Sequence, residues 1–294
     1  MMKRKLNKGL RIVLTAGLCA VMGMAVLTGC GSSDKGSSDS GSSSSTKTVT
    51  IAGSTSVQPL SEVLGEKYSK KHSDVKIDVQ GGGSGEAVKS LKEGICQIGA
   101  LSRDLEAEEK SDVGKQYTIA KDGVAIVVNK DVNIDDITLD QLKDIYTGKI
   151  TNWKDVGGDD ADIAVVSREE GSGTRGAFTE ITGVTKDDKD NTTKDALVQS
   201  STGAVVKTVK STPNSIGYVS LEAVDDSVKA VKVEGVDASA DTVLDGTYKI
   251  SRPFIYVVGD KVDNATQDYI DYVMSDEGQK EVEKAGFIPV GNNK

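Results

Sequence analysis

The sequence predicts an α/β protein whose ordered body forms two lobes. From Thr48 onward, short apolar strands alternate with amphipathic helices, the order typical of α/β folds. A body of about 250 residues is long for a single hydrophobic core, so two lobes with separate cores are favoured. Loops rich in serine, threonine and glycine recur where a strand ends and a helix begins. With 37% apolar and 28% charged residues, the composition is that of a soluble globular protein.

The first 29 residues have the pattern of a secretory signal. An apolar stretch from Ile12 to Leu27 follows a basic head that contains Lys3, Arg4, Lys5, Lys8 and Arg11. This stretch is shorter than the roughly 20 residues needed to span a bilayer as a helix, so a cleaved signal is favoured over a membrane anchor. Its ending, Leu27-Thr28-Gly29-Cys30, resembles a bacterial lipobox, which implies that Cys30 becomes the lipidated first residue of the mature protein.

Residues 30–47 are expected to form a flexible tether between the lipidated cysteine and the folded body. Between residues 31 and 46 there are nine serines and three glycines, a composition that cannot bury a core. Removal of residues 1–29 also takes away five cationic side chains and no acidic ones. The formal net charge of −9 therefore becomes −14 in the mature chain.

The body is expected to contain the following elements in chain order. Their apolar spacing, one proline suited to a first helical turn and one capping box define them. They are a strand at Val49–Ile51, a helix at Pro59–Tyr68, a strand at Val75–Val79, a helix at Ala87–Leu91 ended by Gly94, a strand at Val124–Val128, a helix opened by Thr138–Gln141, a strand at Ile163–Val166, a helix at Ala177–Ile181, a strand at Phe254–Val258 and a long helix at Tyr269–Met274.

The composition also argues against several functional classes. One histidine and three cysteines leave too few soft ligands for a structural zinc site, and the negative charge argues against a nucleic-acid partner. We expect no metal and no cofactor. Cys96 has no partner for an intrachain disulfide and is expected to be a small buried residue. A catalytic thiol would need a histidine, and His72 lies in a polar turn.

Three loops have the composition of an anion-binding helix start: Gly53–Ser56, Gly81–Gly85 and Gly171–Thr174. Ser201–Gly203 is a candidate fourth. Backbone N–H groups of a first helical turn lack partners and carry partial positive charge, and serine or threonine adds hydroxyl donors. A single such loop is commonly an ordinary helix cap. Three of them at the carboxyl ends of strands favour a shared oxyanion ligand.

Arg168 adds a positive charge directly before the third loop. It leaves the strand just ahead of Gly171–Thr174 and has the planar fork that binds an oxyanion bidentately. We expect Glu170 to hold its guanidinium in place. The alternative is an ordinary surface Arg–Glu pair, which contributes little.

These residues resemble the phosphate-binding subunits of bacterial phosphate ABC transporters, the PstS-like solute-binding proteins. The resemblance extends from the lipobox to the C-terminus. Its most specific motifs are Gly53–Leu60, Gly81–Gly85, Ile98–Arg103 and Arg168 with Gly171–Thr174, and Tyr146–Trp153 and Ile216–Val219 also look like family landmarks.

The resemblance implies a type II periplasmic-binding-protein fold, with two doubly wound α/β lobes and a two-segment hinge. Lobe one would comprise residues 48–125 and 250–294, and lobe two residues 126–249, with crossings near Val127 and Ile250. Phosphate would lie between the lobes, held by neutral dipoles and one arginine. The implied binding residues are Ser54, Thr55, Ser56, Ser84, Ser102, Arg168, Ser172, Gly173 and Thr174.

One position departs from part of the family. Some relatives place an aspartate where this chain has Ser102, and that aspartate accepts the hydrogen that phosphate carries and sulfate lacks. Such an acceptor discriminates strongly between the two anions. Here either the Ser102 hydroxyl accepts the phosphate hydrogen, or a carboxylate from elsewhere in the chain, such as Asp122, accepts it; the sequence leaves both open.

As a whole, the resemblance implies a binding protein and not an enzyme. It would be an extracytoplasmic monomer, anchored to the cell membrane through Cys30, that delivers inorganic phosphate to an ABC permease. The alternatives are a receptor for sulfate, molybdate or tungstate, a secreted phosphatase-type hydrolase, and a passive envelope lipoprotein. Residue 86 is Glu, so Ser84 has no nucleophile elbow, and Gly171–Thr174 lacks a P-loop lysine. With a charge of −14, anion capture would rest on short-range dipoles and depend weakly on ionic strength.

Overall fold

The computed structural model describes residues 46–291. The expected signal sequence, the lipidated Cys30 and most of the tether therefore lie outside the described residues. Within residues 46–291, no helix has both the length and the apolar character needed to cross a membrane.

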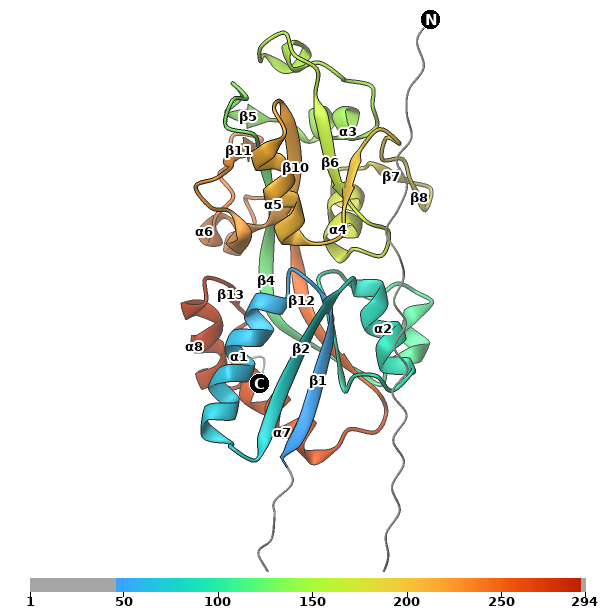
Figure 1. The fold of residues 1–294 in the computed structure, drawn as a ribbon, viewed down its shortest axis with the longest axis vertical. Helices are drawn as coiled ribbons and strands as arrows, with labels where there is room; N and C mark the ends of the chain where they lie inside the picture. Colours follow the sequence, from blue (N-terminus) through green and yellow to red (C-terminus); the bar gives the residue numbers. More distant parts are fainter. Residues whose placement is uncertain (1–45, 292–294) are drawn as a thin grey trace, which may run out of the picture. The chain divides into compact units, whose positions relative to one another are not determined.

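The described chain is an α/β protein (Figure 1). Its strands and helices follow in the order β1 (Lys47–Ser54), α1 (Gln58–Lys71), β2 (Val75–Gly82), α2 (Ser84–Lys92), β3 (Ile98–Leu101), β4 (Lys115–Val128), β5 (Asp136–Ile137), α3 (Leu139–Tyr146), β6 (Ala164–Arg168), α4 (Gly173–Ile181), β7 (Thr185–Lys186), β8 (Lys189–Asp190), β9 (Leu197–Gln199), α5 (Thr202–Ser211), β10 (Ser215–Ser220), β11 (Lys229–Val233), α6 (Ala240–Leu244), β12 (Ser251–Val258), α7 (Asn264–Met274), α8 (Asp276–Lys284) and β13 (Ile288–Pro289).

The first half of the main sheet has the order β2-β1-β3-β12-β4, with β1 parallel to β2 and β3 and with β12 antiparallel to β3 and β4. Helices cover both of its faces. Alternate residues of β12 show this, because Phe254 and Tyr256 pack in the core that contains α1 and α7, whereas Ile255 and Val257 pack against α2. A continuously apolar strand is buried in this way on both faces.

The second half of the sheet repeats this arrangement with different elements. The end of β4 pairs with β10, which is parallel to β6, and β6 is parallel to β9; β11 and β5 follow on the other side of β4. Ile126 and Val128 face the core that contains α3, and Val127 faces the core that contains α5. The expected doubly wound α/β class is therefore confirmed.

Strand β4 links the two halves of the sheet. It pairs with β12 as far as Gly123 and with β10 from Val124 onward. Figure 1 shows β4 and β12 running from the lower group of elements into the upper one. The change of partner strand lies at Val124, three residues before the crossing expected near Val127. Strand β4 itself continues without a break from Lys115 to Val128. The expected lobe boundaries at residues 125/126 and 249/250 remain a prediction.

Several local expectations are confirmed. Thr138 and Gln141 form a capping box at the start of α3, and a proline lies in the first turn of α1. The long helix expected near the C-terminus ends at Met274, because Ser275 caps the following helix α8. Cys96 is 3% exposed, and burial raises the pKa of its thiol to about 11.

Candidate functional site

The polar loops identified in the sequence end neighbouring strands. Strands β1 and β2 are parallel neighbours and lead into α1 and α2, and β6 and β9 are parallel neighbours and lead into α4 and α5. Parallel strands present their carboxyl ends at one edge of a sheet, where ligands bind in open α/β folds. The candidate fourth loop belongs to this set, because Ser201 caps the start of α5.

The four helix starts differ in how their first turns are capped. Helices α4 and α5 are capped by the hydroxyls of Ser172 and Ser201. Helices α1 and α2 have Val57 and Gly83 at the N-cap and no side-chain cap. The hydroxyls beside these two helices are therefore free to bind something other than their own first turn.

Side-chain hydroxyls from the first and second halves of the sheet meet at these helix starts. Ser56 Oγ lies 2.8 Å from Thr174 Oγ1 and 3.1 Å from Thr202 Oγ1. Thr55 Oγ1 lies 3.3 Å from Thr202 Oγ1 and accepts a hydrogen bond from the Thr202 amide at 3.2 Å. These contacts join the start of α1 to the starts of α4 and α5.

A second group of hydroxyls lies beside the start of α2. Ser54 Oγ donates to Ser102 Oγ at 2.8 Å, and the Ser102 amide donates to Ser84 Oγ at 3.1 Å. Ser54, Ser84 and Ser102 are each no more than 4% exposed. We call the two groups together the hydroxyl cluster; its members are Ser54, Thr55, Ser56, Ser84, Ser102, Thr174 and Thr202.

Gly173, the first residue of α4, packs directly against the serines beside the start of α2. A Cβ atom built at this position would lie 2.2 Å from Ser84 Oγ and 2.6 Å from Ser102 Oγ. Nearby, the Gly85 amide donates to the Gly171 carbonyl at 3.1 Å. Only a glycine lets the first turn of α4 approach the serines of the first sheet half this closely.

Arg168 is the cation of this site and is 2% exposed. Its Nη2 donates to Thr55 Oγ1 at 3.3 Å and its Nη1 to Thr202 Oγ1 at 3.4 Å. Its Nε and Nη2 also donate to the two carboxylate oxygens of Glu169, at 2.8 and 2.7 Å. The guanidinium is thus fixed bidentately and points into the hydroxyl cluster.

The expectation that Glu170 holds Arg168 is wrong, because Glu169 is the partner. Strand β6 ends at Arg168, and Glu170 lies exposed in the following turn. A further arginine, Arg175, was not identified from the sequence. Its Nη1 donates to the Arg168 carbonyl at 2.8 Å and its Nε to Asp190 at 2.7 Å, so it fixes the backbone that carries Arg168.

The structure thus brings most of the sequence-predicted site residues together. Each of the following residues lies in or directly against the hydroxyl cluster: Ser54, Thr55, Ser56, Ser84, Ser102, Arg168, Gly173 and Thr174. Ser172 lies at the same helix start, where its hydroxyl accepts from the Arg175 amide. The site also contains Thr202, which was not predicted although its loop was recognised.

Asp122, one of the two candidates for the hydrogen-bond acceptor, has other partners. Its Oδ2 accepts from Nε and Nη2 of Arg252 at 3.1 and 2.9 Å, and its Oδ1 accepts from Ser220 Oγ at 2.8 Å. Burial raises the pKa of this carboxyl, against the opposing effect of Arg252. Asp122 is therefore not directed at the hydroxyl cluster, and Ser102 is the candidate that lies within it.

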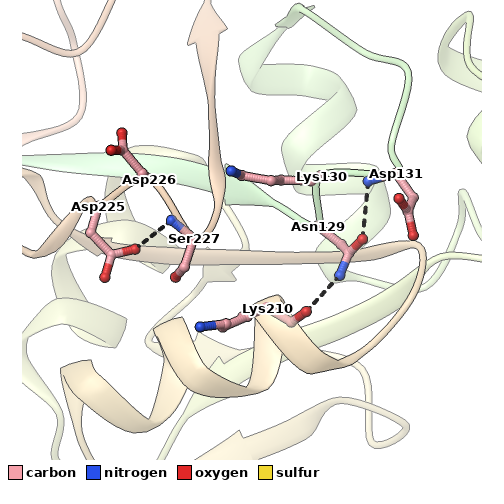
Figure 2. Close-up of a pocket in the computed structure, with 7 residues that line it drawn as sticks. All are labelled: Asn129, Lys130, Asp131, Lys210, Asp225, Asp226 and Ser227. Carbon is pink, nitrogen blue, oxygen red and sulfur yellow. Dashed lines mark hydrogen bonds between the residues drawn. The ribbon is translucent and has the colours of Figure 1, made fainter.

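A pocket of about 730 Å³ lies elsewhere, between the ends of β4 and α5 and the loop before β11 (Figure 2). Its lining mixes two lysines with three aspartates, which is not the surface of an anion site: Asn129, Lys130, Asp131, Lys210, Asp225, Asp226 and Ser227. None of these residues belongs to the hydroxyl cluster. Among residues 46–291, no group of three or more histidine, cysteine or acidic side chains is arranged to hold a metal ion.

The arrangement is suited to binding rather than to covalent chemistry. It gathers buried hydroxyls, helix first turns and one fixed guanidinium, which are donors for the oxygens of a small anion. A serine nucleophile would need an adjacent general base. The single histidine, His72, is exposed at the C-terminus of α1 and stacks on Tyr68.

Comparison with known proteins gives the class of the chain. A family model of the PBP superfamily domain matches residues 38–277. The structure is similar to one from Clostridium perfringens, described as a phosphate ABC transporter substrate-binding protein with bound phosphate. That similarity has a TM-score of 0.79, an identity of 46%, and a coverage of 83% of this chain and 100% of the other. Fold and site together define a solute-binding protein of this superfamily.

The particular family follows from the curated relatives. The chain is 36% identical to the phosphate-binding protein PstS of Bacillus subtilis, over 84% of this chain and 82% of the relative. It is 30% identical to PstS of Borreliella burgdorferi, over 83% and 90%. A phosphate transport receptor from Vibrio cholerae has a TM-score of 0.70 and 39% identity, over 82% of this chain and 100% of the other. The chain belongs to the PstS family, which consists of binding proteins and not of enzymes.

Proposed function

We propose that this protein is an extracytoplasmic receptor that binds inorganic phosphate in the hydroxyl cluster and delivers it to an ABC importer. One observation carries the proposal: hydroxyls from loops far apart in the chain, the first turn of α4 and the buried guanidinium of Arg168 converge on one place. The relatives named as phosphate-binding proteins support the choice of ligand.

The donors match a tetrahedral oxyanion. Thr55, Ser56, Thr174 and the first turn of α4 would donate to the oxygens on one side, and Ser84 to those on the other. Ser102 would accept the hydrogen that phosphate carries. Arg168 would bind through its outer edge while Glu169 holds it in place. Because Glu169 balances the arginine, most of the attraction for the anion would come from neutral dipoles at short range.

Phosphate would bind between two lobes that close around it. We propose residues 48–125 with 250–294 as one lobe and residues 126–249 as the other, with hinge bending where β4 and β12 link the two halves of the sheet. The hydrogen bond from Gly85 to Gly171 would form on closure. A lipid on Cys30 would anchor the receptor to the cell membrane, and it would act as a monomer on its permease.

Calorimetry with phosphate, sulfate, molybdate and tungstate tests the proposal. We expect phosphate to bind most tightly, at one anion per chain. Arg168→Ala should weaken binding at least tenfold, because each hydrogen bond to a charged group contributes about 1.5–3 kcal/mol. Arg168→Lys keeps the charge but loses the planar fork of donors, so its phosphate affinity should lie between those of the wild-type protein and Arg168→Ala.

Each outcome of this experiment separates the alternatives. Tighter binding of another oxyanion would assign the same site to that anion. Unchanged phosphate affinity in Arg168→Ala would mean that phosphate does not bind at this site. Turnover of activated phosphate esters by the wild-type protein would favour the hydrolase alternative, and the absence of binding to every anion would refute the proposal.

A further inference from the structure

A buried ion pair lies where β4 changes its partner strand. Asp122 of β4 and Arg252 of β12 are direct cross-strand partners, and their side chains are 2% and 1% exposed. Burying two charges costs several kcal/mol per ion, and apolar replacements of such pairs are often as stable or more stable. Stability alone is therefore a weak explanation for this pair.

The remaining hydrogen bonds of the pair reach both halves of the sheet. Arg252 Nη1 donates to the Ser102 carbonyl at 3.3 Å, next to the end of β3 in the first half. Asp122 Oδ1 accepts from Ser220 Oγ at 2.8 Å, at the end of β10 in the second half. The pair thus connects a residue of the hydroxyl cluster with the opposite half of the protein.

Ser102 is held at three of its atoms by this network and its neighbours. Its amide donates to Ser84 Oγ, its hydroxyl accepts from Ser54 Oγ, and its carbonyl accepts from Arg252. The first two contacts are made within the hydroxyl cluster, whereas the third comes from Arg252 on β12, which is not a member of the cluster. Without Arg252, the carbonyl would be a buried acceptor lacking this charged donor, and the peptide would be free to turn.

We infer that Arg252, held by Asp122, is a positioning residue for oxyanion binding: it fixes the Ser102 peptide so that the Ser102 hydroxyl faces the ligand. The contact from Ser220 makes this position depend on the arrangement of the second half of the sheet. The inference rests on the proposed function, because it assigns a role in binding at the same site. In this role Arg252 acts through the Ser102 carbonyl, to which its Nη1 donates.

A double-mutant cycle on the full chain tests this role. The variants are Ser102→Ala, Arg252→Met and the two combined, and the measurements are the phosphate Kd by calorimetry and the Tm of the unliganded protein. We expect Arg252→Met to weaken binding by about tenfold or more, and by less than about threefold in the Ser102→Ala background, because residues that act through one another are not additive.

Two further variants separate positioning from general stability. Arg252→Lys should recover part of the lost affinity, since it keeps one donor and the charge opposite Asp122. Gln279→Met removes a different buried side chain that donates to the carbonyls of Ile119 and Val273. This control should lower the Tm without changing the Kd. If Arg252→Met does not fold, the same cycle is run with Ser220→Ala, for which we expect a smaller loss that also disappears in Ser102→Ala.

The outcomes distinguish this inference from the proposed function. Additive losses in the cycle, or a Kd for Gln279→Met that rises as much as that for Arg252→Met, would overturn the positioning role while phosphate binding stands. If the wild-type protein binds another oxyanion instead of phosphate, the cycle is run with that anion. If it binds none, the proposed function and this inference fall together.

Discussion

Substitution of Gly173 by alanine isolates the approach of α4 to the serines of the first sheet half. The added Cβ would lie 2.2 Å from Ser84 Oγ, whereas ordinary contacts begin at 3.4 Å. Either the start of α4 or Ser84 must therefore retreat by about 1.2 Å. The backbone itself tolerates the change, because alanine is favoured over glycine in helices by up to about 1 kcal/mol.

The expected loss of affinity follows from this retreat. Moving the start of α4 by about 1 Å would take the contact between Thr174 and Ser56, now 2.8 Å, beyond hydrogen-bond distance. It would also withdraw the first-turn amides from the anion. Loss of one or two hydrogen bonds to a charged ligand, at about 1.5–3 kcal/mol each, raises the phosphate Kd by about 100-fold.

The assay is calorimetric titration with phosphate, together with the Tm of the unliganded protein. Gly203→Ala is the matched control, since Gly203 lies in the first turn of α5 and a Cβ there would meet nothing within 4 Å. Its Kd should stay within about threefold of the wild-type value. We expect Gly173→Ala to bind weakly with an unchanged or raised Tm. An unchanged Kd, or a loss of affinity matched by unfolding, would refute the reasoning.

Three other predictions concern charge, acidity and the thiol. Phosphate affinity should change less than about threefold between low and physiological salt, because buried dipoles are screened little; a steep decrease in isothermal titrations would indicate a basic surface patch instead. Burial opposes ionisation of Glu109, but hydrogen bonds from Arg103 and the Glu106 amide lower its pKa below 4.5. Its contribution to stability should therefore be complete above about pH 4.5 and be lost as the pH falls through the lowered pKa, so the Tm of Glu109→Gln should depend less on pH there. Finally, Cys96, with a pKa of about 11, should resist thiol reagents at pH 8 and react only on unfolding; rapid labelling of the native protein would contradict its burial.

The sequence predicts the location of the site well, because the relevant signals are local. Serine, threonine and glycine between a strand and a helix indicate a helix start, and parallel strands bring such starts to one edge. The sequence does not predict which hydroxyls meet. Thr202 shows this: its loop is recognisable in the sequence as a candidate fourth helix start, but the contact of Thr202 with Ser56 depends on the pairing of β6 with β9.

The partner of Arg168 shows a second limit. Glu169 and Glu170 are adjacent, and the alternation of side chains in a strand gives no guidance beyond its last residue. Strand β6 ends at Arg168, and the turn that follows exposes Glu170 and leaves Glu169 against the guanidinium. Which of two neighbouring acids pairs with the arginine is decided by turn geometry, and the residue types do not encode it.

The role of Asp122 depends on contacts between residues far apart in the chain. The sequence places a carboxylate near the link between the two halves of the sheet, and its partner Arg252 lies on β12, 130 residues away. Once the pair forms, each oxygen of Asp122 already accepts a hydrogen bond from within the protein. A carboxylate near a binding site is thus informative only when its cation is also known.

The two guanidinium–carboxylate pairs explain how an acidic protein can hold an anion. Arg168 is balanced by Glu169 and Arg252 by Asp122, so each pair adds little net charge to its surroundings. A bound anion would then be attracted mainly by hydroxyls and first-turn amides, whose effect is strong within about 3 Å and weak beyond it. The formal net charge of −9 acts over longer distances and repels anions at the surface. Affinity and bulk charge are therefore separable in this fold: added surface charge would change the rate of capture more than the strength of binding.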